Sequence, residues 1–600
     1  MHQSNVTKSQ QDAHTYRPPE SRSNNFARWP YIFPITLGFL FAICTTATLQ
    51  NAQLQPASLI FILLVLFFPV CFIFLFILCR WLILNIGKTI VQSKKNIDNR
   101  GQEKYGTVSK TTPFNKISHK IKQIFPLNFN VTSIIIASIL LAVCWAPYLI
   151  ALFPGVYWYD TSWQLSTFFT PDQSISDHHP FVTTYLYGAF ANIGIMLWNN
   201  PVIGLYLLVI IQCITTIAIF AAGSCYLKKW DISWPVRFSV LLFFAVFPFF
   251  PAFLSSLAKD TLATPWFILL CILNAEIIRT KGKTLMSAKF SFLFLAVMLA
   301  FSLTKKTGIY ICTATLLALL IYRFSRKIRA IIAALTLIVL SLMLIVVPKA
   351  VMPALGVIPG ESNEIVAVPL QQVANIARND GFLPSDDNDL EKIYGMTAEQ
   401  LKQAYRPYVA DPIKGYTSMD MPTLLRVWME QGVKHPVTFL SAWAGLSASW
   451  FMFYSPSMPP DSGADNARLN ILTNSNHYDK DIEKVFSWNT RTLFGTQVSQ
   501  WYSAGWSRLP GISTLTLKSF WASVLPAFFL FCIFSTRKFR GSSFLILLPV
   551  IINSLTLFVG PTSIYSEALR YLFPQVCAIP LVMVILSKIM RNEVLLDKMD

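Results

Sequence analysis

Long apolar runs without charged side chains constrain this chain more than any other feature. Residues 131–153 and 201–227 contain no charge at all, and 513–536 contain only Lys518. A helix rises about 1.5 Å per residue, so roughly 20 such residues cross the core of a bilayer. Only helices and closed barrels satisfy their backbone polar groups in lipid, and these runs lack the alternation of barrel strands. They predict an all-α integral membrane protein.

The apolar segments are numerous enough for a large helix bundle in the cell membrane. Several are short, so we expect about 11–14 transmembrane helices in a multi-pass protein. The segments fall near 31–49, 57–86, 131–153, 181–198, 201–227, 234–254, 262–278, 286–303, 309–322, 330–348, 437–454, 514–536, 541–559 and 571–590.

The net charge of +19 does not indicate a nucleic-acid partner. Lysines and arginines gather beside apolar runs, as the positive-inside rule predicts, and no nucleic-acid motif accompanies them. Residues 87–130 hold nine basic and two acidic side chains, whereas 154–180 hold three aspartates and no basic residue. We therefore expect the first segment to be cytoplasmic and the second to be external, with membrane lipids as the surroundings.

This charge pattern predicts the domain organisation. Residues 181–198 and 437–454 conflict with a full crossing, so we expect the former to be partly re-entrant or interfacial and the latter to be membrane-associated. The predicted parts are a disordered cytoplasmic tail (1–28), a transmembrane hairpin (29–86), a basic cytoplasmic loop (87–130), a transmembrane core (131–348) with its first external loop at 154–180, an external region (349–512) containing 437–454, C-terminal transmembrane helices (513–590) and a cytoplasmic tail (591–600). A capping-box pattern, Thr397 to Gln400, predicts a helix start in the external region.

The most informative polar residues follow the span at 131–153. Asp160 lies among Tyr157, Trp158, Tyr159 and Trp163, at the external mouth of the predicted bundle. A carboxylate there is placed to accept a proton from a hydroxyl. The alternative is an interfacial aromatic belt with ordinary solvated acids. Adjacent histidines do not share one helical face easily, so His178 and His179 favour a structural or substrate-contact role over a metal site.

Motifs in a fixed order then connect this loop to a family. The pattern Phe-Pro-Gly-x-x-x-Tyr-Asp-x-x-x-Gln at 153–164, followed by His-Pro, resembles a bacterial family of uncharacterised membrane proteins related to GT-C glycosyltransferases. That superfamily includes the protein O-mannosyltransferases and the lipid A aminoarabinose transferase. The resemblance covers roughly 131–590, and its further motifs are Ala-Lys-Asp-Thr at 258–261, Thr-Lys-Lys-Thr-Gly-Ile-Tyr at 304–310, Val-Pro-Leu-Gln-Gln-Val-Ala at 368–374 and Ser-Glu-Ala-Leu-Arg-Tyr-Leu-Phe-Pro at 566–574.

The resemblance implies a GT-C-like helix bundle, a polyprenyl-phosphate-sugar donor and an external loop that bears the catalytic acid. Asp160 matches that acid. No Asp-x-Asp pair accompanies it, so neither a metal nor another cofactor is indicated. The substrate-binding residues that we expect are Tyr159, Gln164, Asp177, His178, His179, Lys259, Asp260, Lys305, Lys306, Arg570 and Tyr571.

The chemistry of such a transfer needs a base for the acceptor hydroxyl and cations for the departing phosphate. Asp160 supplies the first, and the lysines with Arg570 supply the second. Competing explanations are snorkelling of Lys305 and Lys306 to lipid headgroups, a simple Lys259–Asp260 ion pair, and pairing of Arg570 with Glu567 three residues earlier on a helix.

Three functions remain open from the sequence. The first is a membrane glycosyltransferase acting on an extracytoplasmic acceptor, either a cell-envelope glycan or a protein. The second is a transporter or flippase of lipid-linked glycans, and the third is a non-catalytic membrane protein that binds such a lipid. Transporters are often built from repeats with broken helices at the midplane. The chain shows no fixed-period repeat, and its candidate charges gather at the external mouth, which favours the enzyme.

Overall fold

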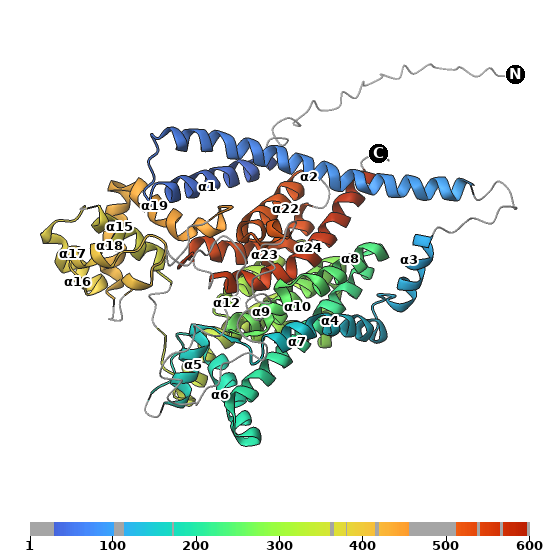
Figure 1. Ribbon diagram of the computed structural model, residues 1–600, viewed down its shortest axis with the longest axis horizontal. Coiled ribbons are helices and arrows are strands. Elements are labelled where there is room, and N and C mark those ends of the chain that lie inside the picture. Colours follow the sequence, from blue (N-terminus) through green and yellow to red (C-terminus); the bar gives the residue numbers. More distant parts are fainter. Residues whose placement is uncertain are drawn as a thin grey trace, which may run out of the picture.

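The computed structural model describes residues 29–100, 113–170, 173–360, 365–379, 381–414, 419–454, 512–536, 540–564 and 568–596. These residues form an all-α protein (Figure 1). The one sheet among them has two short strands. Nine of the described helices are long and apolar enough to cross a membrane, and four shorter apolar helices accompany them. The chain is a multi-pass membrane protein, as its apolar runs predict. The predicted tail 1–28 lies outside the described residues.

Almost every predicted apolar segment is a helix. The principal elements are α1 (Ile32–Leu49), α2 (Leu59–Arg100), α3 (Pro113–Ile124), α4 (Val131–Ala151), β1 (Val156–Tyr157), α5 (Tyr159–Phe169), α6 (Phe181–Trp198), α7 (Pro201–Tyr226), α8 (Trp234–Val246), α9 (Phe249–Leu254), β2 (Ser256–Leu257), α10 (Lys259–Arg279), α11 (Ala288–Thr304), α12 (Gly308–Ile321), α13 (Arg326–Ser341), the π-helix η4 (Leu342–Val351), α14 (Met352–Ala354), α15 (Ala367–Arg378), α16 (Asp387–Tyr394), α17 (Ala398–Ala404), α18 (Met421–Lys434), α19 (Pro436–Ser447), the π-helix η12 (Phe520–Val524), α22 (Leu525–Phe534), α23 (Arg540–Val559) and α24 (Leu569–Leu596).

The apolar segment at 234–254 differs from the expectation of one continuous helix. It is broken into α8 and α9 around Pro248. Proline lacks a backbone N–H and disfavours helical geometry in the residue before it. Phe247 accordingly has extended backbone angles, with φ −75° and ψ 110°. The break turns the chain toward β2 and the start of α10.

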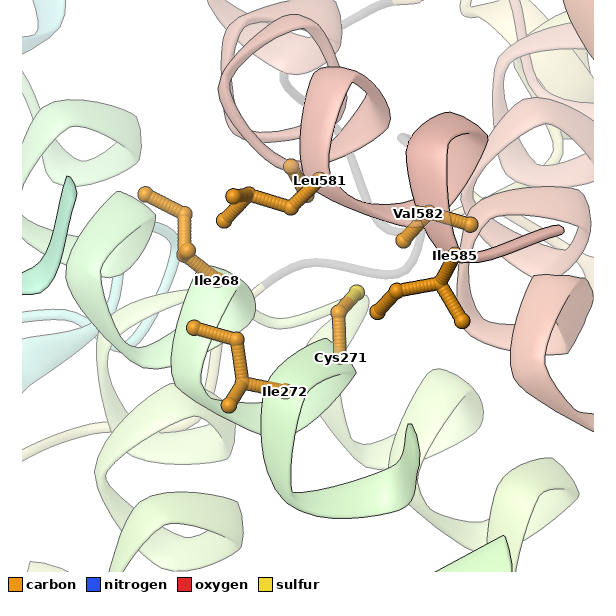
Figure 2. Close-up of a pocket in the computed structure, with 7 residues that line it drawn as sticks. Ile268, Cys271, Ile272, Leu581, Val582 and Ile585 are labelled. Atoms are coloured by element: carbon orange, nitrogen blue, oxygen red, sulfur yellow. The ribbon is translucent and has the colours of Figure 1, made fainter. Parts of the chain in front are cut away.

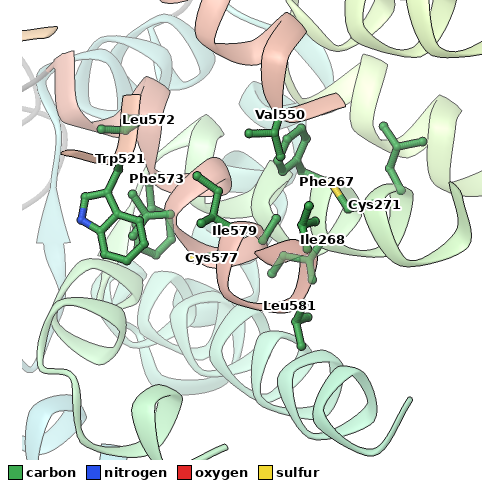
Figure 3. Packing of buried hydrophobic residues seen from close by; sticks show 14 of the residues in the cluster. Phe267, Ile268, Cys271, Trp521, Val550, Leu572, Phe573, Cys577, Ile579 and Leu581 are labelled. Atoms are coloured by element: carbon green, nitrogen blue, oxygen red, sulfur yellow. The ribbon is translucent and has the colours of Figure 1, made fainter. Parts of the chain in front are cut away.

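Helix α10 is the centre of the bundle. It packs against α24, α11, α23 and α7, and 83% of the residues in its most apolar stretch are buried. Buried apolar side chains of the two helices pack together, with Ile268 of α10 near Leu581 of α24 (Figure 3). In a bilayer the lipid tails are as apolar as these side chains, so van der Waals packing and interhelical hydrogen bonds hold such a helix pair together. This packing fixes the starts of α10 and α24 relative to one another.

One small apolar pocket remains between these two helices (Figure 2). Its lining carries no charged group, so it offers no chemistry. The lining residues are Ile268, Cys271 and Ile272 from α10 and Ala578, Leu581, Val582 and Ile585 from α24.

A second, smaller core lies outside the bundle. It is formed by α15–α18 and the start of α19, around buried residues such as Leu370, Tyr394 and Leu424. Its α17 begins with the predicted capping box, in which Thr397 and Gln400 each accept a hydrogen bond from the other's backbone N–H, so that prediction is confirmed. Helices α15–α18 lie at one end of the molecule, and α3 lies at the opposite end (Figure 1). The predicted external region and the predicted basic loop are therefore at opposite ends.

Candidate functional site

Two short parallel strands bring distant loops together at the edge of the bundle. After α4, Gly155 turns the chain with φ +103°, a conformation that favours glycine. A Cβ atom there would also lie 3.2 Å from the carbonyl oxygen of Ser255. Strand β1 then pairs with β2, so that Val156 lies opposite Ser256 and Tyr157 lies opposite Leu257. Each strand leads directly into a helix, α5 or α10.

The two strand–helix units present the same dipeptide. Asp160-Thr161 occupies the second and third positions of α5, and Asp260-Thr261 occupies those of α10. Because the strands are parallel and in register, both aspartates lie three residues beyond a paired position. Thr161 Oγ1 donates a hydrogen bond across to the Leu257 carbonyl at 2.6 Å. The pairing therefore brings two carboxylates to one end of the bundle.

Buried amide and indole groups hold these loops in place. Gln212 Nε2 on α7 donates to the carbonyls of Leu254 and Ser256, at 2.7 and 2.6 Å. Trp158 Nε1 donates to Ser256 Oγ at 2.9 Å. The Gln212 hydrogen bonds add to those that the same carbonyls accept from Cys213 and Thr261, so these buried backbone groups are well satisfied. Sequence reasoning did not single out Gln212, because an isolated glutamine in an apolar run carries no spacing signal.

Asp160 is held by two cations. Its Oδ2 lies 2.8 Å from Lys259 Nζ and 2.8 Å from Arg570 Nη1, and all three side chains are between 10% and 14% exposed. Burial raises the pKa of Asp160, but the facing charges of Arg570 and Lys259 outweigh burial and hold this pKa well below its usual range. The carboxylate is therefore ionised.

His179 completes this half of the site. Its Nδ1 lies 2.8 Å from Lys259 Nζ and 3.6 Å from Asp160 Oδ2. Burial, together with the Lys259 charge, holds the pKa of His179 well below its usual value. The imidazole is then neutral, its Nδ1 accepts the lysine's hydrogen bond, and its proton is on Nε2.

Asp260 forms the second, deeper half of the site. Its side chain is fully buried, and its Oδ1 lies 2.8 Å from Lys305 Nζ. Its Oδ2 lies 4.0 Å from Arg570 Nε. Tyr571 supports both cations: its carbonyl accepts from Lys305 Nζ at 3.2 Å, and its hydroxyl accepts from Arg570 Nη2 at 3.0 Å. Its ring also lies 5.0 Å from Arg570 Cζ.

The charges of this cluster do not cancel. Among the described side chains, Lys259, Lys305 and Arg570 face Asp160 and Asp260, with His179 neutral. The cluster therefore holds one surplus positive charge in a largely buried place. Such a charge is costly without a counter-ion, so the arrangement favours binding of an anion.

The other predicted site residues lie around this cluster or apart from it. Lys306 pairs with Asp177 at 3.4 Å on the surface, where the lysine is 47% exposed. Gln164 is buried and donates to Thr183 and Thr184 of α6, which braces α5 against that helix.

Two further predicted site residues have aromatic rings. The ring of His178 lies 5.9 Å from that of Trp163. The side chain of Tyr159 is 60% exposed. No group of three or more His, Cys, Asp or Glu side chains suited to a metal is found in the described parts of the chain. Glu567, which the sequence offered as a partner for Arg570, lies outside those parts.

Four helix ends meet at this site. They are the starts of α5, α10 and α24 and the end of α11. The opposite end of α10 carries a different cluster, in which Glu276 contacts Arg279, Lys229 and the Tyr226 hydroxyl. The predicted external charges and the predicted cytoplasmic basic residues are thus separated by the full length of α10.

The comparison with protein families then covers most of this architecture. The model of a family of unknown function, DUF6020, matches residues 169–595. The chain belongs to this family. The match includes Lys259, Asp260, Lys305 and Arg570 and begins after Asp160. Among curated proteins and among solved structures, none matches the chain.

Proposed function

We propose that this protein is a membrane glycosyltransferase of GT-C type, which moves a sugar from a polyprenyl-phosphate donor to an extracytoplasmic acceptor. The acceptor class is a cell-envelope glycan or a protein. The observation that carries the proposal is the buried cluster at the helix ends, with three cations and two carboxylates. The cations suit a phosphate, and a carboxylate beside them suits an acceptor hydroxyl.

The location of the cluster supports a lipid-linked substrate. Lys259 and Arg570 are the first and second residues of two candidate membrane spans. A polyprenyl chain in the bilayer would then bring its phosphate to the depth of these side chains. Ionisable groups at such positions are costly and mark functional sites in membrane proteins. The motif resemblance to GT-C enzymes supports the same donor class.

The reaction divides the roles between the two halves of the cluster. Arg570, Lys305 and Lys259 would stabilise the phosphate as the bond to the sugar breaks, because Arg and Lys make charge-assisted hydrogen bonds to phosphate oxygens. Asp160 would accept the proton of the attacking hydroxyl. A phosphate is a good leaving group, so the reaction needs no separate acid to protonate it.

The test begins with lipids that co-purify with the protein. Mild-detergent extracts are examined by native mass spectrometry for a bound polyprenyl phosphate or polyprenyl-phosphate sugar. The purified protein with that lipid is then incubated with cell-envelope fractions, and loss of the sugar from the lipid is measured. Transfer that Asp160→Asn removes supports the proposal. Movement of the lipid-linked glycan across liposomes without transfer would instead indicate a flippase.

A further inference from the structure

The geometry of Asp160 poses a difficulty for its role as a base. Its Oδ2 lies 2.8 Å from both Lys259 Nζ and Arg570 Nη1. A carboxylate held by two cations is stabilised in its ionised form, and its affinity for a proton falls. General bases work best when their pKa lies near the operating pH. For Asp160 to accept a proton, at least one of these cations must leave it.

A second partner for Arg570 lies ready on its other side. Asp260 Oδ2 and Arg570 Nε face one another at 4.0 Å. Both atoms are buried, and neither has a hydrogen-bond partner. A hydrogen bond to a carboxylate needs about 2.7–2.9 Å. A guanidinium shift of roughly 1 Å therefore forms this contact, and it satisfies two buried groups together.

From this arrangement we propose that Asp260 is a positioning residue, which takes Arg570 over from Asp160 when the donor phosphate binds and so leaves Asp160 free to act as the base. The inference rests on the proposed function and assigns Asp260 a task apart from phosphate contact. Arg570 suits it because its planar fork contacts two carboxylates at once, which a lysine's single ammonium group does less well.

The burial of the two carboxylates explains the direction of this shift. Asp160 is 14% exposed, whereas Asp260 is fully buried. A phosphate that enters from the mouth therefore meets the Asp160 half first and competes with Asp160 for Lys259 and Arg570. The surplus positive charge of the cluster accommodates the first negative charge of the phosphate. Asp260 stays paired with Lys305 and attracts the Arg570 guanidinium toward the deeper half of the site.

The chemical step then balances within the site. The acceptor oxygen forms a bond to the anomeric carbon as its proton passes to the freed Asp160 oxygen. The bond between that carbon and the phosphate oxygen breaks, and its electron pair stays on the phosphate. Arg570, held by Asp260, and Lys259 lie against the developing charge.

The test compares two substitutions that remove the same charge. A short-chain isoprenyl monophosphate is titrated into purified full-length protein by calorimetry. Simple electrostatics predicts that Asp160→Asn and Asp260→Asn both tighten binding, because each removes a negative charge from the cluster. The proposal predicts opposite signs: Asp160→Asn tightens binding by about tenfold, and Asp260→Asn weakens it by about tenfold, each equal to roughly 1.4 kcal/mol.

The control is Asp389→Asn. Asp389 on α16 pairs with Arg426 on α18, at the surface of the second, smaller core. Its replacement removes the same charge, and phosphate affinity should stay unchanged. If Asp260→Asn does not fold, Arg570→Lys replaces it. That variant keeps the charge but lacks the guanidinium fork, so the proposal predicts at least tenfold weaker binding, whereas a site governed by charge alone stays within about twofold.

The outcomes separate the two proposals. Opposite signs support the transfer of Arg570. Tighter binding in both aspartate variants, or unchanged affinity in Arg570→Lys, overturns it and leaves the phosphate site standing. An unaltered protein that binds no isoprenyl monophosphate overturns the proposed function itself.

Discussion

Two consecutive lysines, Lys305 and Lys306, form ion pairs of very different burial. Lys305 is 5% exposed and pairs with a fully buried Asp260, at 2.8 Å. Lys306 is 47% exposed and pairs with Asp177, which is 26% exposed, at 3.4 Å. The two side chains are alike in chemistry and adjacent in sequence, so a comparison between them isolates the effect of burial on stability.

Lys305→Met should lower the free energy of unfolding by about 3 kcal/mol. Removing one partner of a buried pair costs about 3–5 kcal/mol, because the other charge loses its direct partner. The lower end applies here, since Arg570 Nε still lies 4.0 Å from Asp260 and the variant also removes the surplus positive charge of the cluster. Lys306→Met should cost about 0–1 kcal/mol, as exposed pairs do. Methionine keeps most of the apolar stem in both variants.

Reversible unfolding in mixed detergent micelles measures both free energies. The double variant Asp260→Asn/Lys305→Met provides a further check, because it removes the uncompensated charge and should recover part of the loss. Two results would contradict this reasoning. Lys305→Met could cost no more than Lys306→Met, or the double variant could lose more free energy of unfolding than its two single variants together. Either result would show that burial of the Asp260–Lys305 pair does not control the stability of this site.

Three further predictions concern catalysis, topology and donor binding. Asp160→Asn should reduce transfer by about 10²–10⁴-fold with folding unchanged; a purified variant with the parental rate would require another base. A cysteine in place of Lys110 should react with an impermeant maleimide only after the cells are permeabilised, because 87–130 is predicted to be cytoplasmic; labelling of intact cells would reverse the orientation. Arg570→Ala should weaken affinity for an isoprenyl monophosphate more than Glu567→Ala does; equal loss of stability, with affinity unchanged in the surviving protein, would mark a structural pair.

The membrane helices were predictable from sequence because hydropathy is a local property. Segments such as 131–153 and 541–559 coincide closely with α4 and α23. The break of 234–254 at Pro248 does not follow from hydropathy, although proline gives a local signal for it. Two apolar segments contain π-helices, at Leu342–Val351 and Phe520–Val524. Such interruptions of an α-helix depend on packing with neighbouring helices, and no residue pattern in the sequence predicts them.

The candidate site was predictable as a set of residues but not as an arrangement. Charge at the ends of apolar runs singled out Asp160, Lys259, Lys305 and Arg570. Their partners do not follow from the sequence, because ion pairs between distant segments depend on tertiary contacts. The alternatives to a phosphate site paired residues close in sequence, Lys259 with Asp260 and Arg570 with Glu567, whereas the structure joins Asp160 to Lys259 and Asp260 to Lys305. The repeated Asp-Thr dipeptide was the signal that would have indicated two equivalent carboxylates.

The positions of the charged residues along the chain also bear on biosynthesis. Synthesis proceeds from the N-terminus, so Asp160, Lys259, Asp260 and Lys305 enter the membrane long before Arg570. These four side chains are electrically balanced by themselves, and their two contacts, Asp160–Lys259 and Asp260–Lys305, involve no residue of α24. Before α24 is made, these four side chains therefore provide no surplus charge to attract an anion. Arg570 on α24 adds that charge, so under the proposed function the phosphate site is completed only after α24 has been inserted.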